Sequence, residues 1–160
     1  HRVEQNHYFA YNHLKMGLLN KAVGSISETR MGILSEWSLR LALAFLFFSH
    51  GLPKIESLIS DPGEPFGYVV PMAFFGEFPL ISSYLVTAAE LVFIPLFIFV
   101  GGLKFIGPNA RALSTLGGLI GACTMLIIIF VFHFGVKGEG ILDVKYQLSL
   151  LAMSLYFLFK

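Results

Sequence analysis

The sequence predicts an all-α fold, a four-transmembrane-helix bundle that follows an N-terminal amphipathic extension. Two observations support this fold class. Of the 160 residues, 56% are hydrophobic and only 13% are charged, whereas about 25% of the residues in a soluble domain are charged. Four apolar runs each approach the roughly 20 residues that a helix needs to cross a bilayer. The chain is therefore expected to be an integral membrane protein with lipid bound around it.

Residues 1–32 are predicted to form a separate polar and amphipathic segment. Apolar side chains recur in it at roughly helical spacing, although Gly17 and Gly24 weaken the helix. Such a segment suits the membrane surface or a partner protein. Its histidines, at positions 1, 7 and 13, are six residues apart. That spacing fits no compact set of metal ligands, so solvated histidines are the simpler interpretation.

Residues 33–160 are predicted to form the membrane domain. The four apolar runs predict helices over residues 33–52, 80–100, 112–134 and 141–159. Glycine follows or closes each of the first three runs, with Pro53 just after the first, as is typical of helix ends. Gly101 ends the second run and Gly135 the third.

The start of the fourth run is crowded by polar residues, among them Asp143, Lys145 and Gln147. Its helix therefore has alternatives. It uses the whole run, or it begins nearer Tyr146. In the second case it is short, or it continues beyond Lys160.

Lysine and arginine are distributed unequally over the two sides of the predicted membrane domain. Both termini and the loop 101–111 lie on one side and carry seven of them, against three on the other side. The positive-inside rule then places both termini in the cytoplasm. We expect a bacterial-type inner (plasma) membrane. The net charge of +1 argues against a nucleic-acid partner.

The connection 53–79 is long for a link between neighbouring helices. It contains five prolines, yet its second half, 68–79, is apolar. We expect that half to dip into the membrane interface and cover the bundle, or to be an interfacial loop with no gating role.

Glu90 lies near the middle of the second apolar run. A charged side chain at the centre of a bilayer costs roughly 2.5–3.5 kcal/mol or more, so such residues are commonly functional. Counting helical rise from the outer helix ends places Arg40 at a similar depth. We therefore expect an intramembrane polar site in which Arg40 pairs with Glu90, with a Glu36–Arg40 pair four residues apart as the competing arrangement.

A second candidate site gathers at the outer face, where His50, Lys54, His133 and Asp143 all lie by topology. Two histidines and a carboxylate can bind a divalent metal, hold a quinone head group, or relay protons toward Glu90. Four ligands with recognisable spacing are absent, so no metal site is predicted.

The third run carries a face of small residues that includes Gly117, Gly118 and Gly121. Such a face allows close helix packing. It leaves open whether the partner helix belongs to this chain or to another subunit.

Residues 35–160 carry a dispersed pattern: Arg40 early in the first helix, the His50-Gly51 turn followed by Lys54, the acid at Glu90, and His133. This pattern resembles that of the DoxX-like family of small membrane proteins. It implies a four-helix membrane bundle linked to redox processes, as a subunit of a thiosulfate:quinone oxidoreductase or as a partner of thiol and superoxide defence enzymes.

The function expected from the sequence is that of an accessory or stabilising subunit of a larger, redox-linked membrane complex. It is expected to be a non-catalytic subunit of an oxidoreductase-type assembly, because no complete catalytic motif is visible. The alternative is a redox subunit with its own quinone site at the outer face, and the third is proton or ion transport. Quinone and lipid are the candidate bound molecules, and other membrane subunits the expected partners.

Overall fold

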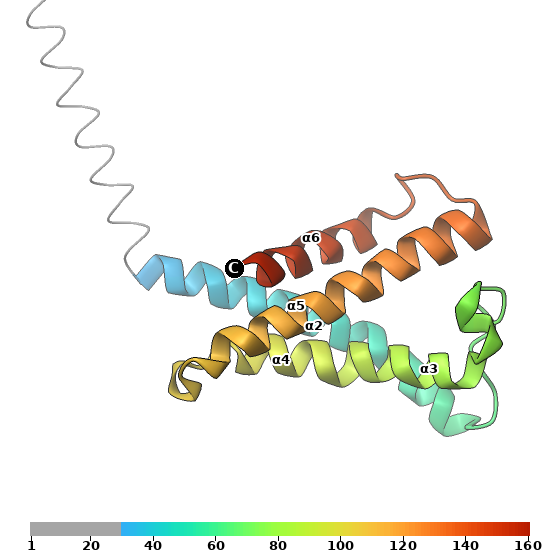
Figure 1. Cartoon of the computed structure of the whole chain (residues 1–160), viewed down its shortest axis with the longest axis horizontal. Helices are drawn as coiled ribbons and strands as arrows, with labels where there is room; N and C mark the ends of the chain where they lie inside the picture. The colour runs from blue at the N-terminus through green and yellow to red at the C-terminus, as the bar shows by residue number, and fades with distance from the viewer. Residues whose placement is uncertain (1–29) are drawn as a thin grey trace, which may run out of the picture. The chain divides into compact units, whose positions relative to one another are not determined.

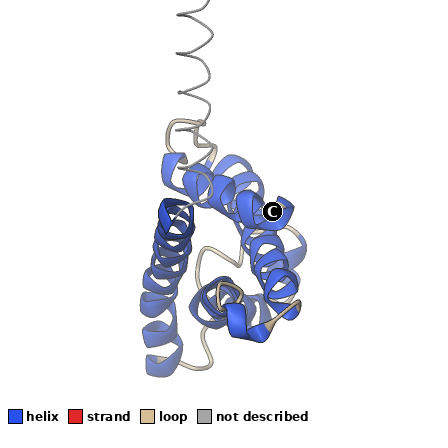
Figure 2. Cartoon of the chain, turned by 90° about the vertical axis from the view of Figure 1, so that its left-hand side faces the viewer, coloured by secondary structure: helices blue, strands red, loops and turns tan. Residues whose placement is uncertain are grey.

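The structure, a computed structural model, describes residues 30–160. Within this range every regular element is a helix, and no strand occurs (Figures 1 and 2). The elements in order are α2 (Arg30–Ser60), η1 (Phe74–Glu77), α3 (Pro79–Ala88), η2 (Ala89–Phe93), α4 (Ile94–Val100), η3 (Lys104–Ile106), α5 (Asn109–Ile127), η4 (Ile128–Lys137) and α6 (Lys145–Phe159). The predicted all-helical class is confirmed for the described residues.

Within residues 30–160, three continuous helical stretches are long and apolar enough to cross a membrane: Gly32–Ser60, Pro79–Val100 and Asn109–Lys137. They support the prediction of a membrane protein. The fourth predicted helix, α6, has 15 residues and begins at Lys145, after a turn over residues 141–144. This matches the short alternative, because 15 residues rise only about 22 Å. The amphipathic segment predicted over residues 1–32 lies almost entirely outside the described residues.

The first helix does not end at Pro53, as the sequence predicted, but continues through it to Ser60. A proline inside a helix removes one backbone hydrogen bond and costs about 3 kcal/mol or more. The last turns of α2 are held by tertiary contacts that offset this cost. Leu58 is buried in a cluster with Phe66, Val69 and Met72 of the following loop, and Lys54 forms the ion pair described below.

The third helix also runs past its predicted end at Gly135 and stops at Gly138 instead. Gly138 has φ 66°, in the left-handed region that glycine favours, and its N–H bonds to the carbonyl of His133. The next N–H, of Glu139, bonds to the same carbonyl at 2.9 Å. The turn at Gly138 thus folds Glu139 back toward His133.

Replacing Gly138 with alanine should lower the free energy of unfolding by about 1–2 kcal/mol, the cost of a left-handed conformation for a residue with a Cβ. Thermal unfolding in lipid nanodiscs measures it. Gly140→Ala is the matched control, because Gly140 has no positive φ and a Cβ there would make an ordinary 3.5 Å contact with Asp143. Equal losses in the two variants would contradict a conformational role for Gly138.

Residues 39–160 form one compact unit in which α5 packs against both α4 and α6. The small-residue face of α5 makes these contacts. A Cβ on Gly117 would lie 3.0 Å from Phe97 of α4, and one on Gly118 would lie 2.5 Å from the backbone nitrogen of Leu158 in α6. The face is therefore occupied by helices of the same chain. The core around it comprises Leu43, Phe47, Ile94, Ile98, Met125, Ile129, Val144, Leu150 and Phe157.

Candidate functional site

Glu90 lies on a π-helical turn, η2, and its side chain is fully buried. A hydrogen bond from the N–H of Ile94 to the carbonyl of Ala89, five residues back, defines the turn. A π-helical turn contains one residue more than an α-helical turn. Such turns are frequent at functional sites. The second span is thus irregular at the position of its buried acid.

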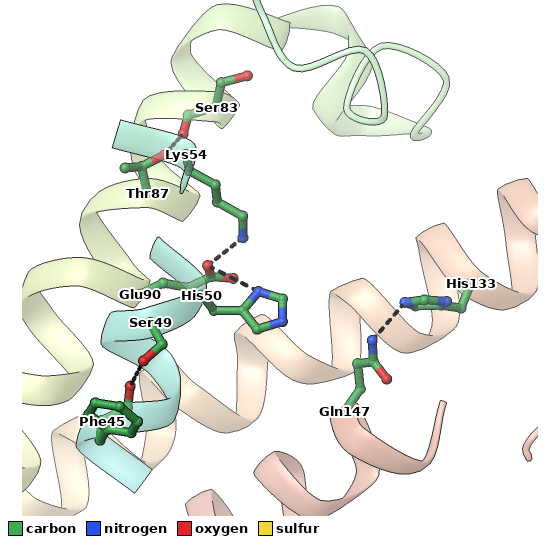
Figure 3. Close-up of polar contacts among 9 residues, drawn as sticks. All are labelled: Phe45, Ser49, His50, Lys54, Ser83, Thr87, Glu90, His133 and Gln147. Atoms are coloured by element: carbon green, nitrogen blue, oxygen red, sulfur yellow. Dashed lines mark hydrogen bonds and ion pairs between the residues drawn. The ribbon is translucent and has the colours of Figure 1, made fainter. Parts of the chain in front are cut away.

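Lys54 and His50 approach Glu90 from α2 (Figure 3). The ammonium group of Lys54 donates to Oε2 of Glu90, and Nδ1 of His50 lies 3.9 Å from the same oxygen. Residues four apart share one face of a helix, so this arrangement requires α2 to continue through Pro53. Gly51 permits the close approach, since a Cβ there would lie 3.0 Å from the backbone nitrogen of Leu91.

Tyr68 belongs to the same site, although the sequence analysis did not select it. Its ring lies 6.0 Å from the Lys54 nitrogen and 5.4 Å from both Phe66 and Phe132. Burial raises the pKa of the Tyr68 hydroxyl, and the nearby charge of Glu90 raises it further. Tyr68 therefore stays protonated and is a hydrogen-bond donor. Its position at the start of the apolar half of the loop 53–79 was the available signal.

Two buried oxygen atoms of this site have no hydrogen-bond partner among the described residues: Oε1 of Glu90 and the hydroxyl of Tyr68. Gln147 Oε1 and Ser154 Oγ share this property elsewhere in the unit. Buried polar atoms in native proteins are almost always hydrogen-bonded, and leaving one unpaired costs about 1–3 kcal/mol. The unpaired oxygens of Glu90 and Tyr68 fit a polar group supplied from outside the chain.

An apolar cavity of about 210 Å³ lies against Tyr68. Its lining comes from the loop, from the second span and from the third span: Tyr68, Val69, Met72, Phe75, Ser82, Leu85, Val86, Ala89, Thr124, Ile127 and Ile128. Tyr68 is part of the wall of the cavity, as is Ala89, the residue directly before Glu90. An apolar cavity of roughly 150 Å³ can hold a benzene ring, so this one accommodates a substituted six-membered ring.

His133 forms a separate polar group on the second π-helical segment, η4. Its Nδ1 bonds to the carboxylate of Glu139, and its Nε2 lies 3.2 Å from the amide nitrogen of Gln147 (Figure 3). A carboxylate only accepts, so Nδ1 carries the hydrogen and Nε2 accepts from Gln147. The hydrogen bond from His133 lowers the pKa of Glu139, and Lys137, 3.1 Å away, adds to this effect.

The predicted outer-face cluster is therefore divided. His50 and Lys54 join Glu90, whereas His133 joins Glu139 and Gln147. Asp143 belongs to neither group, because its carboxylate accepts the N–H of Gly140 within its own exposed turn. The two groups approach each other at α6, where Tyr146 stacks on His50 with ring centroids 5.3 Å apart. Within residues 30–160, no three His, Cys, Asp or Glu side chains are arranged to hold a metal ion.

Arg40 is not placed beside Glu90. Its guanidinium donates to the carbonyl of Ile98 at 2.6 Å and to the hydroxyl of Ser114 at 2.9 Å. Ile98 provides one of the last four carbonyls of α4, which a helix leaves without an intrahelical partner, and a cation there also complements the helix dipole. Depth alone could not distinguish this carbonyl from the acid of Glu90. Arg40 thus ties α2 to the end of α4 and the start of α5.

Comparison of the chain with protein-family models, curated proteins and solved structures gave no match.

Proposed function

We propose that this chain is a four-helix membrane protein of a redox-linked complex, with both termini in the cytoplasm, and that it binds the head group of a membrane quinone beside Glu90. One observation carries the proposal: an apolar cavity of ring size is lined by Tyr68, whose buried hydroxyl is unpaired, and by Ala89, which directly precedes Glu90 with its unpaired buried Oε1.

The two oxygens complement the polar atoms of a quinone ring. The Tyr68 hydroxyl is a donor suited to a ring carbonyl, and Oε1 of Glu90 is an acceptor suited to the hydroxyl of the reduced form. The apolar lining suits the ring, and the surrounding lipid suits an isoprenoid tail. A quinone supplies reversible uptake of two electrons and two protons, the electrons being exchanged with a partner redox enzyme. Lys54 and His50 hold Glu90 in place through Oε2.

Fewer observations support the accessory-subunit function. The small residues of α5 pack within the chain, so they no longer argue for a neighbouring subunit. What supports it is the N-terminal segment, which lies almost entirely outside the described residues, and the absence of a complete catalytic motif. Proton or ion transport rests on Glu90 alone.

The proposal is tested by the affinity of decylubiquinone for the full chain in lipid nanodiscs. Glu90→Gln should weaken binding roughly 10–150-fold, the equivalent of a hydrogen bond to a charged group, and Tyr68→Phe roughly 2–12-fold, the equivalent of a neutral one. Tyr84→Phe is the matched control, because the Tyr84 hydroxyl bonds to the carbonyl of Pro62 and does not line the cavity.

Unchanged affinity in both Glu90→Gln and Tyr68→Phe would overturn the quinone site. If wild-type protein binds no decylubiquinone, and extraction from native membranes in mild detergent retains a stoichiometric large enzyme, the accessory function is favoured instead.

A further inference from the structure

We infer that His50 is the proton-transfer residue of the Glu90 site and that Tyr146 positions its ring. The inference deepens the proposed function. It rests on that function in one respect, namely that a bound quinone takes up the protons.

The two carboxylate oxygens of Glu90 have different surroundings. Oε1 has no partner among the described residues, whereas Oε2 faces Lys54 and His50 (Figure 3). One oxygen is thus available to a ligand, and the other is in contact with the groups that can exchange a proton. Because Glu90 is fully buried, a proton that reaches Oε2 from solvent is passed on by one of the side chains around that oxygen.

The titratable groups around Glu90 come from three elements: Lys54 and His50 from α2, Tyr68 from the loop before α3, and Tyr146 from α6. Lysine and tyrosine ordinarily hold their protons throughout the neutral range, and burial strengthens the hold of Tyr68. Histidine alone gains and loses a proton near neutral pH. The chemistry of the neighbours therefore selects His50.

The position of His50 also suits proton transfer. Its side chain is 40% exposed, against 14% for Lys54, and its Nδ1 lies 3.9 Å from Oε2 of Glu90. That distance exceeds a hydrogen bond, and contacts of this kind commonly tighten when a ligand binds. The step is balanced: the imidazolium gives its Nδ1 proton to the Glu90 carboxylate, leaving neutral imidazole and a carboxylic acid, and the exposed ring then regains a proton from solvent.

Tyr146 fixes the direction of the imidazole. The two rings stack with an interplanar angle of 19°, which restrains the His50 ring in the plane that directs Nδ1 toward Glu90. Among the described residues no hydrogen bond or ion pair joins Tyr146 to Glu90, so Tyr146 acts through His50. The stacking needs an aromatic ring but not the hydroxyl.

The experiment follows the carboxyl band of Glu90 by infrared spectroscopy after a pH jump, on the full chain in nanodiscs without added ligand. Glu90→Gln identifies the band by removing it. His50→Ala should slow its relaxation about tenfold or more, and added imidazole should restore the rate. Tyr146→Phe should relax as the wild type does, and Tyr146→Leu more slowly. Circular dichroism and thermal unfolding check that each variant folds.

His133→Gln is the matched control, because His133 pairs with Glu139 instead of Glu90. Wild-type relaxation in His50→Ala, slowing that imidazole does not restore, or equal slowing in His133→Gln would each overturn the inference. The infrared measurement needs no quinone. A failure of decylubiquinone to bind would therefore overturn the proposed function, while the role of His50 in proton transfer could still be judged from the relaxation rates.

Discussion

Replacing Lys54 with methionine is expected to lower the free energy of unfolding by about 3–5 kcal/mol, the cost of removing one partner of a buried ion pair. Methionine keeps most of the volume of the side chain and removes only its charge. The fully buried Glu90 carboxylate would then be left without its cation. Chemical or thermal unfolding in nanodiscs at neutral pH measures the loss.

The double variant Lys54→Met with Glu90→Gln separates charge from packing. It should recover most of the lost stability, because no unpaired charge remains. Lys137→Met is the matched control: Lys137 pairs with Glu139, but 46% of its side chain is exposed, and exposed pairs contribute about 0–1 kcal/mol. If Glu90→Gln recovers nothing, Lys54 stabilises the fold by its packing over Tyr68 and not by its charge.

Replacing Gly118 with leucine is expected to cost about 3 kcal/mol or more, at the upper end of the range for overpacked cores. A Cβ at this position would lie 2.5 Å from the nitrogen of Leu158 and 2.7 Å from the carbonyl oxygen of Ser154. Both are backbone atoms of α6, so no side-chain rotation relieves the clash, and α5 and α6 must separate. Thermal unfolding again provides the measurement.

Gly118→Ala makes this prediction sharper, because alanine favours a helix by about 1 kcal/mol relative to glycine. Any loss of stability in that variant must therefore come from the clash with α6. Gly67→Leu is the control, since a Cβ on Gly67 meets nothing within 4 Å. A stabilised Gly118→Ala variant would show that α6 packs less closely than described.

The sequence could predict those parts of the fold that depend on local composition. The length and apolarity of the runs predicted the helical class and the three long spans. Glu90 stood out because one acid in an apolar run is costly wherever the run packs. The early ending at Pro53 was wrong because the proline rule is local, while the contacts of Lys54 and Leu58 that offset it come from residues distant in sequence.

The remaining parts of the site depend on how distant segments meet. Tyr68 reaches the site only because its loop folds back over the spans, which no spacing within the loop encodes. Arg40 and Glu90 were paired by depth, yet helix rise does not say which partner lies at that depth, and Arg40 bonds to the end of α4. The π-helical turns at Glu90 and His133 leave no compositional mark, because the same apolar residues fill a regular α-helix.

The π-helical turn at Glu90 lets the second span take up one extra residue without changing the neighbours of its two halves. A π-helical turn closes its hydrogen bond over five residues where an α-helical turn closes it over four, so the added residue is accommodated within η2 and α4 keeps its facing relative to α3. Ile94 and Ile98 are therefore fully buried in the core, and the carbonyl of Ile98 stays within reach of Arg40. Deleting one residue between Ala89 and Phe93 would restore a regular α-helix and leave these contacts in place. The change would fall on the turn itself, which holds Glu90.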